Sequence, residues 1–117
     1  MSNIELMEKA LPVAPLKIAA LDSRKELGQK VNNYIVQFRK DTRKESLDSP
    51  LFCNYQSDNY LISCHCPRFG SGEAKGLLDE TIRGKDLFVM VDVCNYSLTY
   101  TVNGHLNHMS PDDTIRI

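Results

Sequence analysis

The stretch DLFVMVDV at residues 86–93 decides the fold class of this chain. Its apolar side chains fall on both faces of an extended strand, a pattern typical of a strand buried in a parallel sheet. Gly84 separates it from residues 77–83, for which we predict a short strand or a turn. This pattern therefore predicts a parallel sheet. We expect the segments before residue 77 to contain its other strands.

A strand and a helix come earlier in the chain. The apolar run LKIAAL at residues 16–21 has the length of a strand. Ser23 and Glu26 then form a capping-box pattern, and apolar side chains at helical spacing predict an amphipathic helix over residues 25–39 with a core-facing stripe. That stripe consists of Leu27, Val31, Tyr34, Ile35 and Phe38. With a strand predicted at residues 59–66, the order indicates an α/β fold with a right-handed crossover.

The remaining segments are less regular. Residues 4–11 predict a short amphipathic helix, and the polar stretch at residues 40–58 predicts a loop. In residues 95–109 the apolar side chains recur with neither the period of a helix nor that of a strand. Residues 110–113, Ser-Pro-Asp-Asp, have the composition of a helix start, with serine as the N-cap and proline as the first helical residue. Because only four residues follow, we expect the chain to end within a domain.

Composition excludes several classes of protein. The chain has 117 residues, the length of one domain or part of one, and carries 14 basic and 15 acidic residues, so it lacks the basic excess of a nucleic-acid-binding protein. No apolar run approaches the roughly 20 residues of a membrane span. Residues 1–11 do not resemble a secretory signal, and the four cysteines are expected to be reduced thiols. We therefore expect a cytoplasmic protein that binds neither nucleic acid nor membrane.

A glycine-rich stretch, RFGSGEAKG at residues 68–76, follows the strand predicted at residues 59–66. It is not a phosphate-binding loop, since its lysine precedes the last glycine and no Ser or Thr follows. Two interpretations stay open. It is either a flexible turn or a ligand loop, in which Phe69 offers an aromatic face, Ser71 a hydroxyl and Glu73 a carboxylate. Ligands of open α/β sheets bind beyond the carboxyl ends of the strands, where this loop lies.

Two other clusters invite a functional interpretation. Cys64-His65-Cys66 resembles part of a metal site, but on a strand the two thiols face one side and the imidazole the other. The remaining ligands would have to come from Cys53, Cys94, His105 and His108, and none has a standard spacing, so we predict no metal site.

The second cluster is the acidic pair Asp112-Asp113, followed by Thr114. Such a pair could hold a ribose, but here it follows Ser110-Pro111, and acids in that place favour a helix N-terminus. We therefore interpret it as part of a helix cap. No pairing of a nucleophile with a base has geometric support, so no catalytic residue is predicted.

The order of these pieces resembles the N-terminal domain of ribose-phosphate pyrophosphokinase (phosphoribosyl pyrophosphate synthetase). Two stretches carry the resemblance. RFGSGE at residues 68–73 resembles a family pattern of a basic residue, Phe, Ser, Asn, any residue and Glu, with Gly70 in the place of Ser and Ser71 in the place of Asn. ETIRGKDLFV at residues 80–89 resembles a Glu-Ser-Val-Arg-Gly-Asp stretch that leads into a buried strand. The match spans about residues 16–93, and residues 95–113 look like a divergent bacterial branch.

The resemblance implies a phosphoribosyltransferase-like three-layer domain with a mostly parallel sheet. This domain would occupy residues 16–117, after an N-terminal extension at residues 1–15, and would be truncated and incomplete at its C-terminus. The family is an oligomeric, cytoplasmic kinase of nucleotide biosynthesis, a transferase that moves pyrophosphate from ATP to ribose 5-phosphate with magnesium. ATP and Mg²⁺ are therefore the cofactors expected of the whole enzyme.

For the site, the resemblance implies that the loop after the second strand crosses a subunit contact and holds the adenine of ATP. Phe69 would stack on the ring, Ser71 stands where the family has Asn, and Glu73 would accept a hydrogen bond from the exocyclic amine. Gly70 and Gly72 replace larger polar residues, so these contacts are expected to be weaker or rearranged.

The family's second domain, with its ribose-phosphate loop and catalytic loop, has no counterpart in these residues. We therefore expect this chain alone not to make phosphoribosyl pyrophosphate. As partners we expect further copies of the chain or full-length synthetase subunits. Two alternatives stay open: a non-catalytic regulatory module that joins such subunits, and a small thiol or metal protein.

Overall fold

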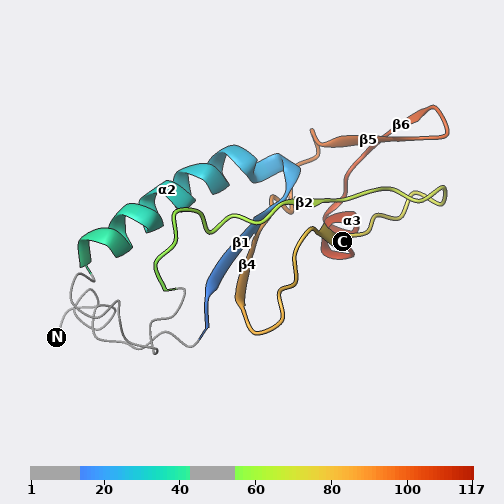
Figure 1. Ribbon diagram of the computed structural model, residues 1–117. Coiled ribbons are helices and arrows are strands. Elements are labelled where there is room, and N and C mark those ends of the chain that lie inside the picture. The colour runs from blue at the N-terminus through green and yellow to red at the C-terminus, as the bar shows by residue number, and fades with distance from the viewer. Residues whose placement is uncertain (1–13, 43–54) are drawn as a thin grey trace.

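A computed structural model of the chain describes residues 14–42 and 55–117. Helix α2 and strands β1 and β4 form one half of the molecule, while the β5–β6 hairpin and α3 project from the other end (Figure 1). The helix predicted at residues 4–11 lies outside the described residues, as does most of the loop predicted at residues 40–58.

A parallel strand pair forms the centre of the packed half. Strand β1 (Leu16–Ala20) pairs in parallel with β4 (Asp86–Met90), with Leu16 opposite Asp86 and Ala20 opposite Met90. On its other side, β1 contacts residues 60–62, also in parallel: the Ile18 N–H donates to the Tyr60 carbonyl over 2.8 Å. The predicted α/β class with parallel pairing is confirmed.

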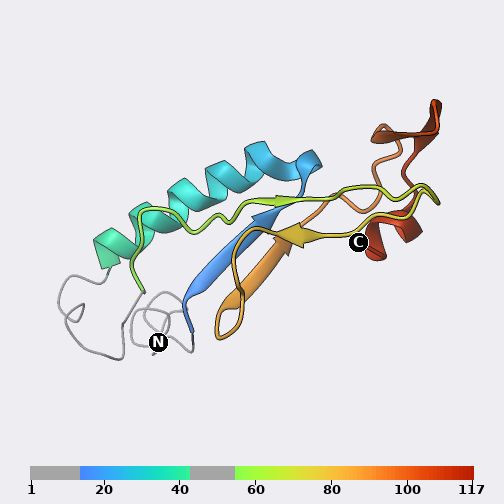
Figure 2. The same ribbon diagram turned by 45° about the vertical axis from the view of Figure 1, so that its right-hand side comes forward.

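Helix α2 (Lys25–Thr42) follows β1 and covers one face of this sheet (Figure 2). It confirms the predicted helix and continues beyond residue 39. The predicted capping box is wrong, because a 3-10 turn, η1 (Asp22–Arg24), comes first. The Arg24 N–H donates to the Leu21 carbonyl over 2.7 Å, so Ser23 lies within a helical turn and not at an N-cap.

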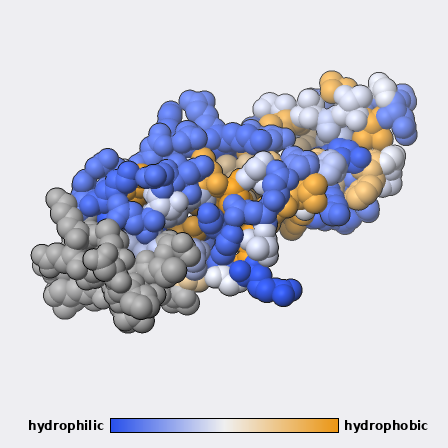
Figure 3. Space-filling model, viewed as in Figure 1, coloured by the Kyte–Doolittle hydropathy of each residue, from blue (hydrophilic) through white to orange (hydrophobic). Residues whose placement is uncertain are grey.

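The face that α2 buries differs from the predicted stripe. Gly28 and Asn32 are buried, whereas Tyr34 is 71% exposed and Leu27 is also exposed. The cause is a close approach of helix and strand: a Cβ added to Gly28 would lie 2.6 Å from the Cβ of Ala20. The outer surface of α2 is mainly hydrophilic (Figure 3).

The core includes a cluster of Ala19, Ile62 and Cys64, against which Leu21, Leu78 and Leu87 pack. Its buried side chains are mostly apolar, and Tyr60 is the largest of those that are fully enclosed. Asn32 is a polar exception with a structural role, since its Oδ1 accepts a hydrogen bond from the Tyr60 N–H at 2.7 Å. The other buried members are Ile18, Ala19, Ala20, Tyr55, Ile62 and Cys64.

Short antiparallel pairs extend this core. Strand β2 (Cys64–His65) pairs with β3 (Leu77–Leu78), which confirms a short strand after residue 76. The strand predicted over residues 59–66 is broken into a bridge at Leu61 and β2. Strand β4 ends at Met90, earlier than predicted.

The burial predicted for β4 is wrong. Phe88 is 60% exposed and Val89 is 57% exposed, although both lie in the middle of the strand. The physical reason is that β1 is the only strand paired with β4 among the described residues, so β4 forms an edge of the sheet.

The projecting end consists of a hairpin and a short helix. Strands β5 (Thr99–Val102) and β6 (His105–His108) are antiparallel, and the hairpin was not predicted. Its turn has positive φ at Asn103 and Gly104, as a two-residue hairpin turn of type I′ requires. Helix α3 (Pro111–Ile115) confirms the predicted start, with a capping box between Ser110 and Asp113.

The sheet carries a helix on one of its faces in the described residues, and the three-layer arrangement remains an expectation from the family resemblance (Figure 2). Within residues 14–42 and 55–117, no helix is both long enough and apolar enough to cross a membrane.

Candidate functional site

The glycine-rich stretch forms a tight hairpin in the projecting half of the molecule (Figure 1). Arg68 and Ala74 form an antiparallel bridge, and the Phe69 N–H donates to the Glu73 carbonyl over 2.8 Å. Gly72 has a φ of 91°, which only glycine adopts readily, and its N–H closes the turn onto the Phe69 carbonyl at 2.9 Å. Residues 68–74 therefore form a turn closed by its own backbone hydrogen bonds, and a turn of this kind can also hold a ligand.

Arg68 attaches this hairpin to the neighbouring strand β5. Its guanidinium carbon lies 3.7 Å from the centre of the Tyr100 ring, a close cation–π contact. Its Nη1 also donates to the Gly72 carbonyl over 2.9 Å. One side chain therefore fixes both the turn and the position of the turn against β5.

A polar groove of about 400 Å³ opens between the hairpin, β5 and α3. Ser71 and Glu73, two of the three predicted binding residues, line it. Among the described residues, neither the Ser71 hydroxyl nor the Glu73 carboxylate has a side-chain partner, so both are free to bind a ligand. The other lining residues are Arg68, Gly72, Ala74, Tyr100, Asp113 and Arg116.

Phe69 does not line this groove. It lies opposite Glu73 in the hairpin, where its N–H donates to the Glu73 carbonyl over 2.8 Å, and the residue is 54% exposed. The groove therefore includes the hydroxyl and the carboxylate but not the aromatic face.

Charges of both signs surround the groove. The Ser110 backbone N–H and the Ser110 hydroxyl, both bonded to Asp113, hold the pKa of that carboxyl below its usual value, and Arg68 and Arg116 contribute in the same direction. Arg116 pairs with Asp112 over 3.0 Å at the surface of α3. Asp113 therefore acts in the helix cap through these hydrogen bonds, in agreement with the interpretation of the acidic pair.

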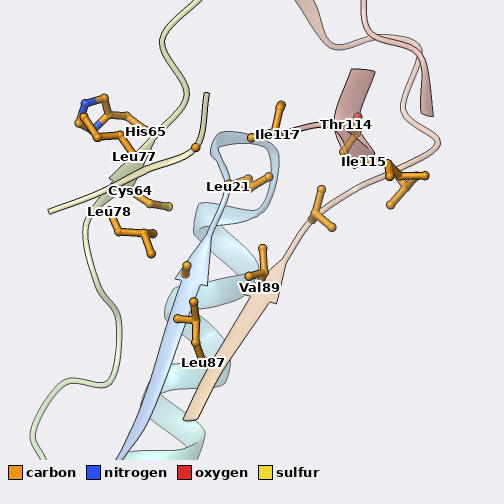
Figure 4. A pocket seen from close by; sticks show the side chains of 14 residues that line it. Leu21, Cys64, His65, Leu77, Leu78, Leu87, Val89, Thr114, Ile115 and Ile117 are labelled. Atoms are coloured by element: carbon orange, nitrogen blue, oxygen red, sulfur yellow. The ribbon is translucent and has the colours of Figure 1, made fainter. Parts of the chain in front are cut away.

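A second, apolar cavity of about 460 Å³ lies on the sheet face opposite α2. Leu21, Leu87 and Val89 point into it, and Ile115 and Ile117 from the C-terminal region close one side (Figure 4). His65 and Thr114 are its polar lining side chains. This chemistry suits apolar packing and offers little to a charged substrate.

A third, smaller cavity of about 180 Å³ lies at the carboxyl ends of β1 and β4. Its Asp92 carboxylate is held by Arg24 over 2.7 Å, which ties the turn after β1 to the segment after β4. The Asp92 carboxylate is therefore already paired with Arg24, and this ion pair stabilises the contact between the two strand ends.

The Cys64-His65-Cys66 segment has the alternation predicted for a strand. The Cys64 thiol is buried and donates to the Ala20 carbonyl over 3.2 Å, whereas His65 lies on the surface, 3.8 Å from Asp79. Burial raises the pKa of both the Cys64 and Cys66 thiols, which disfavours the thiolate that binds metals. No three His, Cys, Asp or Glu side chains in the described part of the chain are grouped to hold a metal ion.

The comparison with protein families decides the assignment. The sequence model described as the N-terminal domain of ribose phosphate pyrophosphokinase matches residues 16–110. The chain belongs to this family. No curated protein and no solved structure matches the sequence. The matched residues of this pyrophosphokinase domain include the whole hairpin at residues 68–74 and the hairpin β5–β6.

The structure adds groove residues of the pyrophosphokinase domain that the sequence did not indicate. Tyr100 belongs to a hairpin that was not predicted, although Asn103-Gly104 is a strong hairpin signal. Arg116 lies at the end of α3, far from the glycine-rich stretch in sequence, and no local pattern connects the two. Arg68 could have been identified from the sequence, because it is the basic residue that begins the family pattern.

Proposed function

We propose that this chain is the nucleotide-binding N-terminal domain of a ribose-phosphate pyrophosphokinase and that the hairpin at residues 68–74 binds the adenine of ATP. The observation that carries the proposal is the free Glu73 carboxylate, on a rigid turn beside the exposed Phe69 ring, in a member of this family. By the same resemblance, the whole enzyme acts in nucleotide biosynthesis.

The chemistry of adenine fits these two side chains. An aromatic ring provides a stacking surface for any base, so Phe69 supplies affinity without selecting the base. A carboxylate accepts hydrogen bonds and donates none when ionised. Glu73 therefore favours the 6-amino group of adenine and disfavours the 6-oxo group of guanine.

The groove beside the hairpin offers positive charge for the phosphates. Arg68 and Arg116 both line it, and arginine binds phosphate oxygens through paired N–H donors. Arg68 is also fixed by Tyr100, so its guanidinium is oriented before a ligand arrives. Ser71 can donate its hydroxyl proton to a sugar or phosphate oxygen.

Transfer of the pyrophosphoryl group is proposed to need the family's second domain. The described residues hold no group of three or more His, Cys, Asp or Glu side chains suited to a metal ion. What these residues do, on this proposal, is to select and orient the nucleotide.

The proposal is tested by calorimetric titration of the pure chain with ATP and with GTP. We expect ATP to bind more tightly, and Phe69→Ala to weaken both nucleotides by about tenfold or more because stacking is lost. Glu73→Gln should reduce the preference for ATP over GTP, since its amide can serve either base. Equal binding of ATP and GTP by the unchanged chain, together with no effect of Glu73→Gln, would contradict the proposal.

Matched controls lie on the same molecule. Leu106→Ala removes another exposed apolar side chain, from β6, and Glu26→Gln removes an exposed carboxylate from α2. Both should leave nucleotide affinity unchanged. Release of AMP from ATP and ribose 5-phosphate by the pure chain would show that the second domain is not required.

A further inference from the structure

Arg68 carries a positive charge that forms no ion pair with a carboxylate in the described part of the chain. Arg24 and Arg116, by contrast, each pair with an aspartate. The Arg68 side chain is half-buried, and its Nη1 donates to the Gly72 carbonyl over 2.9 Å. Its other N–H donors have no acceptor among the described residues. Because free donors on a charged group bind anions strongly, this guanidinium is suited to an anionic ligand.

The helix cap of α3 keeps a nearby carboxylate from neutralising Arg68. Asp113 lines the same groove as Arg68. The pKa of Asp113 is lowered mainly by the Ser110 N–H and hydroxyl and also by the charge of Arg68, so the two charges face the same space. The Asp113 Oδ2 accepts from the Ser110 N–H over 3.0 Å and from the Ser110 hydroxyl over 2.9 Å. These bonds hold the carboxylate in the cap and leave the guanidinium unpaired.

The Tyr100 ring fixes the guanidinium from the other side. Arg68 and Tyr100 line both the polar groove and the smaller cavity at the carboxyl ends of β1 and β4, so the stacked pair forms a wall between them. The guanidinium carbon lies 3.7 Å from the ring centre, well within the range of a cation–π contact. The smaller cavity is lined by the carboxylates of Asp22 and Asp92. Without the ring, the guanidinium would be free to turn toward these carboxylates.

We propose that Tyr100 is a positioning residue for the phosphates of the bound nucleotide, because its ring holds the Arg68 guanidinium with its free N–H donors available to phosphate oxygens. This inference rests on the proposed nucleotide function and extends it to the β5–β6 hairpin. Arginine binds phosphate through paired donors in one plane. A guanidinium whose plane is set in advance loses less conformational freedom on binding. The hairpin therefore decides how well the site distinguishes a nucleotide from a nucleoside.

The ring of Tyr100, and not its hydroxyl, carries this role. The hydroxyl has no hydrogen-bond partner among the described residues, and the ring face is what attracts the cation. Tyr100→Phe therefore keeps the contact, whereas Tyr100→Leu keeps an apolar side chain on β5 and removes the ring. Tyr96→Leu is the matched control. Tyr96 stacks on His108 of the same hairpin, with ring centres 4.3 Å apart, and lines neither the groove nor the smaller cavity.

The first test compares ATP with adenosine in calorimetric titrations of the full chain. We expect Tyr100→Leu to weaken ATP by about fivefold or more and to leave adenosine unchanged, because adenosine has no phosphate for Arg68 to bind. Tyr100→Phe and Tyr96→Leu should both retain the affinity for ATP. The proposal is overturned by an unchanged ATP affinity in Tyr100→Leu, by equal losses for ATP and adenosine, or by equal losses in Tyr100→Leu and either of the other two variants.

The second test observes the Arg68 side chain directly by NMR. Protons that lie over an aromatic ring resonate upfield because of the ring current, so the Arg68 Nε–H should move downfield in Tyr100→Leu. In Tyr100→Phe and Tyr96→Leu it should keep its position. Unchanged backbone amide shifts in α2 and β1 would show that each variant is folded. An Arg68 resonance that does not respond to Tyr100→Leu would overturn the positioning role.

This inference and the nucleotide proposal fail separately. Inorganic tripolyphosphate has the phosphates without adenine, so its binding, followed by the same Arg68 resonance, tests Arg68 and Tyr100 alone. Binding that is weakened by Tyr100→Leu and not by Tyr96→Leu supports the positioning role even if ATP and GTP bind equally. No binding of tripolyphosphate to the unchanged chain would overturn it. In that case, adenosine binding that is weakened by Phe69→Ala would still support the adenine site.

Discussion

The two halves of this molecule are stabilised in different ways. In the packed half, α2, β1 and residues 55–64 hold nearly all of the buried side chains, and hydrogen bonds join segments far apart in sequence. In the projecting half, which contains the 68–74 hairpin, β5, β6 and α3, Thr114 is the buried residue among those described. Turns, a helix cap and the contacts of Arg68 maintain that half.

This difference explains where the candidate binding groups lie. Side chains in the packed half are committed to apolar contacts or to internal hydrogen bonds, as with Asn32 and Tyr60. In the projecting half the backbone is shaped by local interactions, so Phe69, Ser71 and Glu73 remain available to a ligand. Binding residues commonly lie on loops that a packed scaffold supports. The comparison predicts large effects of substitutions in one half and small, local effects in the other.

The largest effect is expected from Tyr60→Ala. Tyr60 is 1% exposed, and its hydroxyl donates to the Tyr55 carbonyl and accepts from the Ser57 N–H. Emptying this position should lower the free energy of unfolding by about 3–5 kcal/mol. Tyr60→Phe, the control, keeps the ring and should cost about 1 kcal/mol. Denaturant unfolding followed by circular dichroism measures both, and equal losses would mean that the ring is not central to the core.

The next effect is expected from Gly28→Ala. The added methyl group would lie 2.6 Å from the Ala20 Cβ, so α2 must move away from β1. We expect a loss of about 1–3 kcal/mol, despite the better helix propensity of alanine. Gly70→Ala is the matched control in the projecting half, since a Cβ there meets nothing within 4 Å. If Gly28→Ala proved stabilising, the close packing of α2 on β1 would be disproved.

A smaller effect is expected from Ser110→Ala in the projecting half. The Ser110 hydroxyl accepts from the Asp113 N–H over 3.1 Å, and its loss should destabilise α3 by about 0.5–2 kcal/mol. Faster amide hydrogen exchange confined to α3 would report this, with Gly28 and its neighbours unaffected. Ser71→Ala provides the control. A loss of global stability equal to that of Gly28→Ala would remove the distinction between the halves.

The smallest effect concerns pH. The pKa of Asp113 is held below its usual value by the Ser110 N–H and hydroxyl, so the ionised form stabilises the folded cap. This stability is complete above the unfolded pKa of about 3.9 and is lost as pH falls through the lower, folded pKa. We expect α3 to loosen below about pH 4. Asp113→Asn should remove this dependence, and NMR chemical shifts of α3 during an acid titration would measure it.

Much of the fold could be predicted from the sequence, but the composition of the site only in part. Ser71 and Glu73 were predicted and do line one groove, because they share a short loop whose turn is closed by its own backbone. Tyr100 and Arg116 reach the same groove from β5 and the end of α3. Their approach depends on the path of the chain between residues 76 and 99, which no local pattern encodes.

The sequence alone determined the α/β class, helix α2, the cap at Ser110 and the family resemblance, because periodicity, capping and short motifs act between near neighbours in the chain. Only the tertiary structure decided which face of α2 is buried, since one close approach of Gly28 to Ala20 overrides the apolar stripe. Tertiary structure also left Phe88 and Val89 exposed on β4. Burial of a strand depends on what lies beside it, and that is decided by contacts between segments distant in sequence.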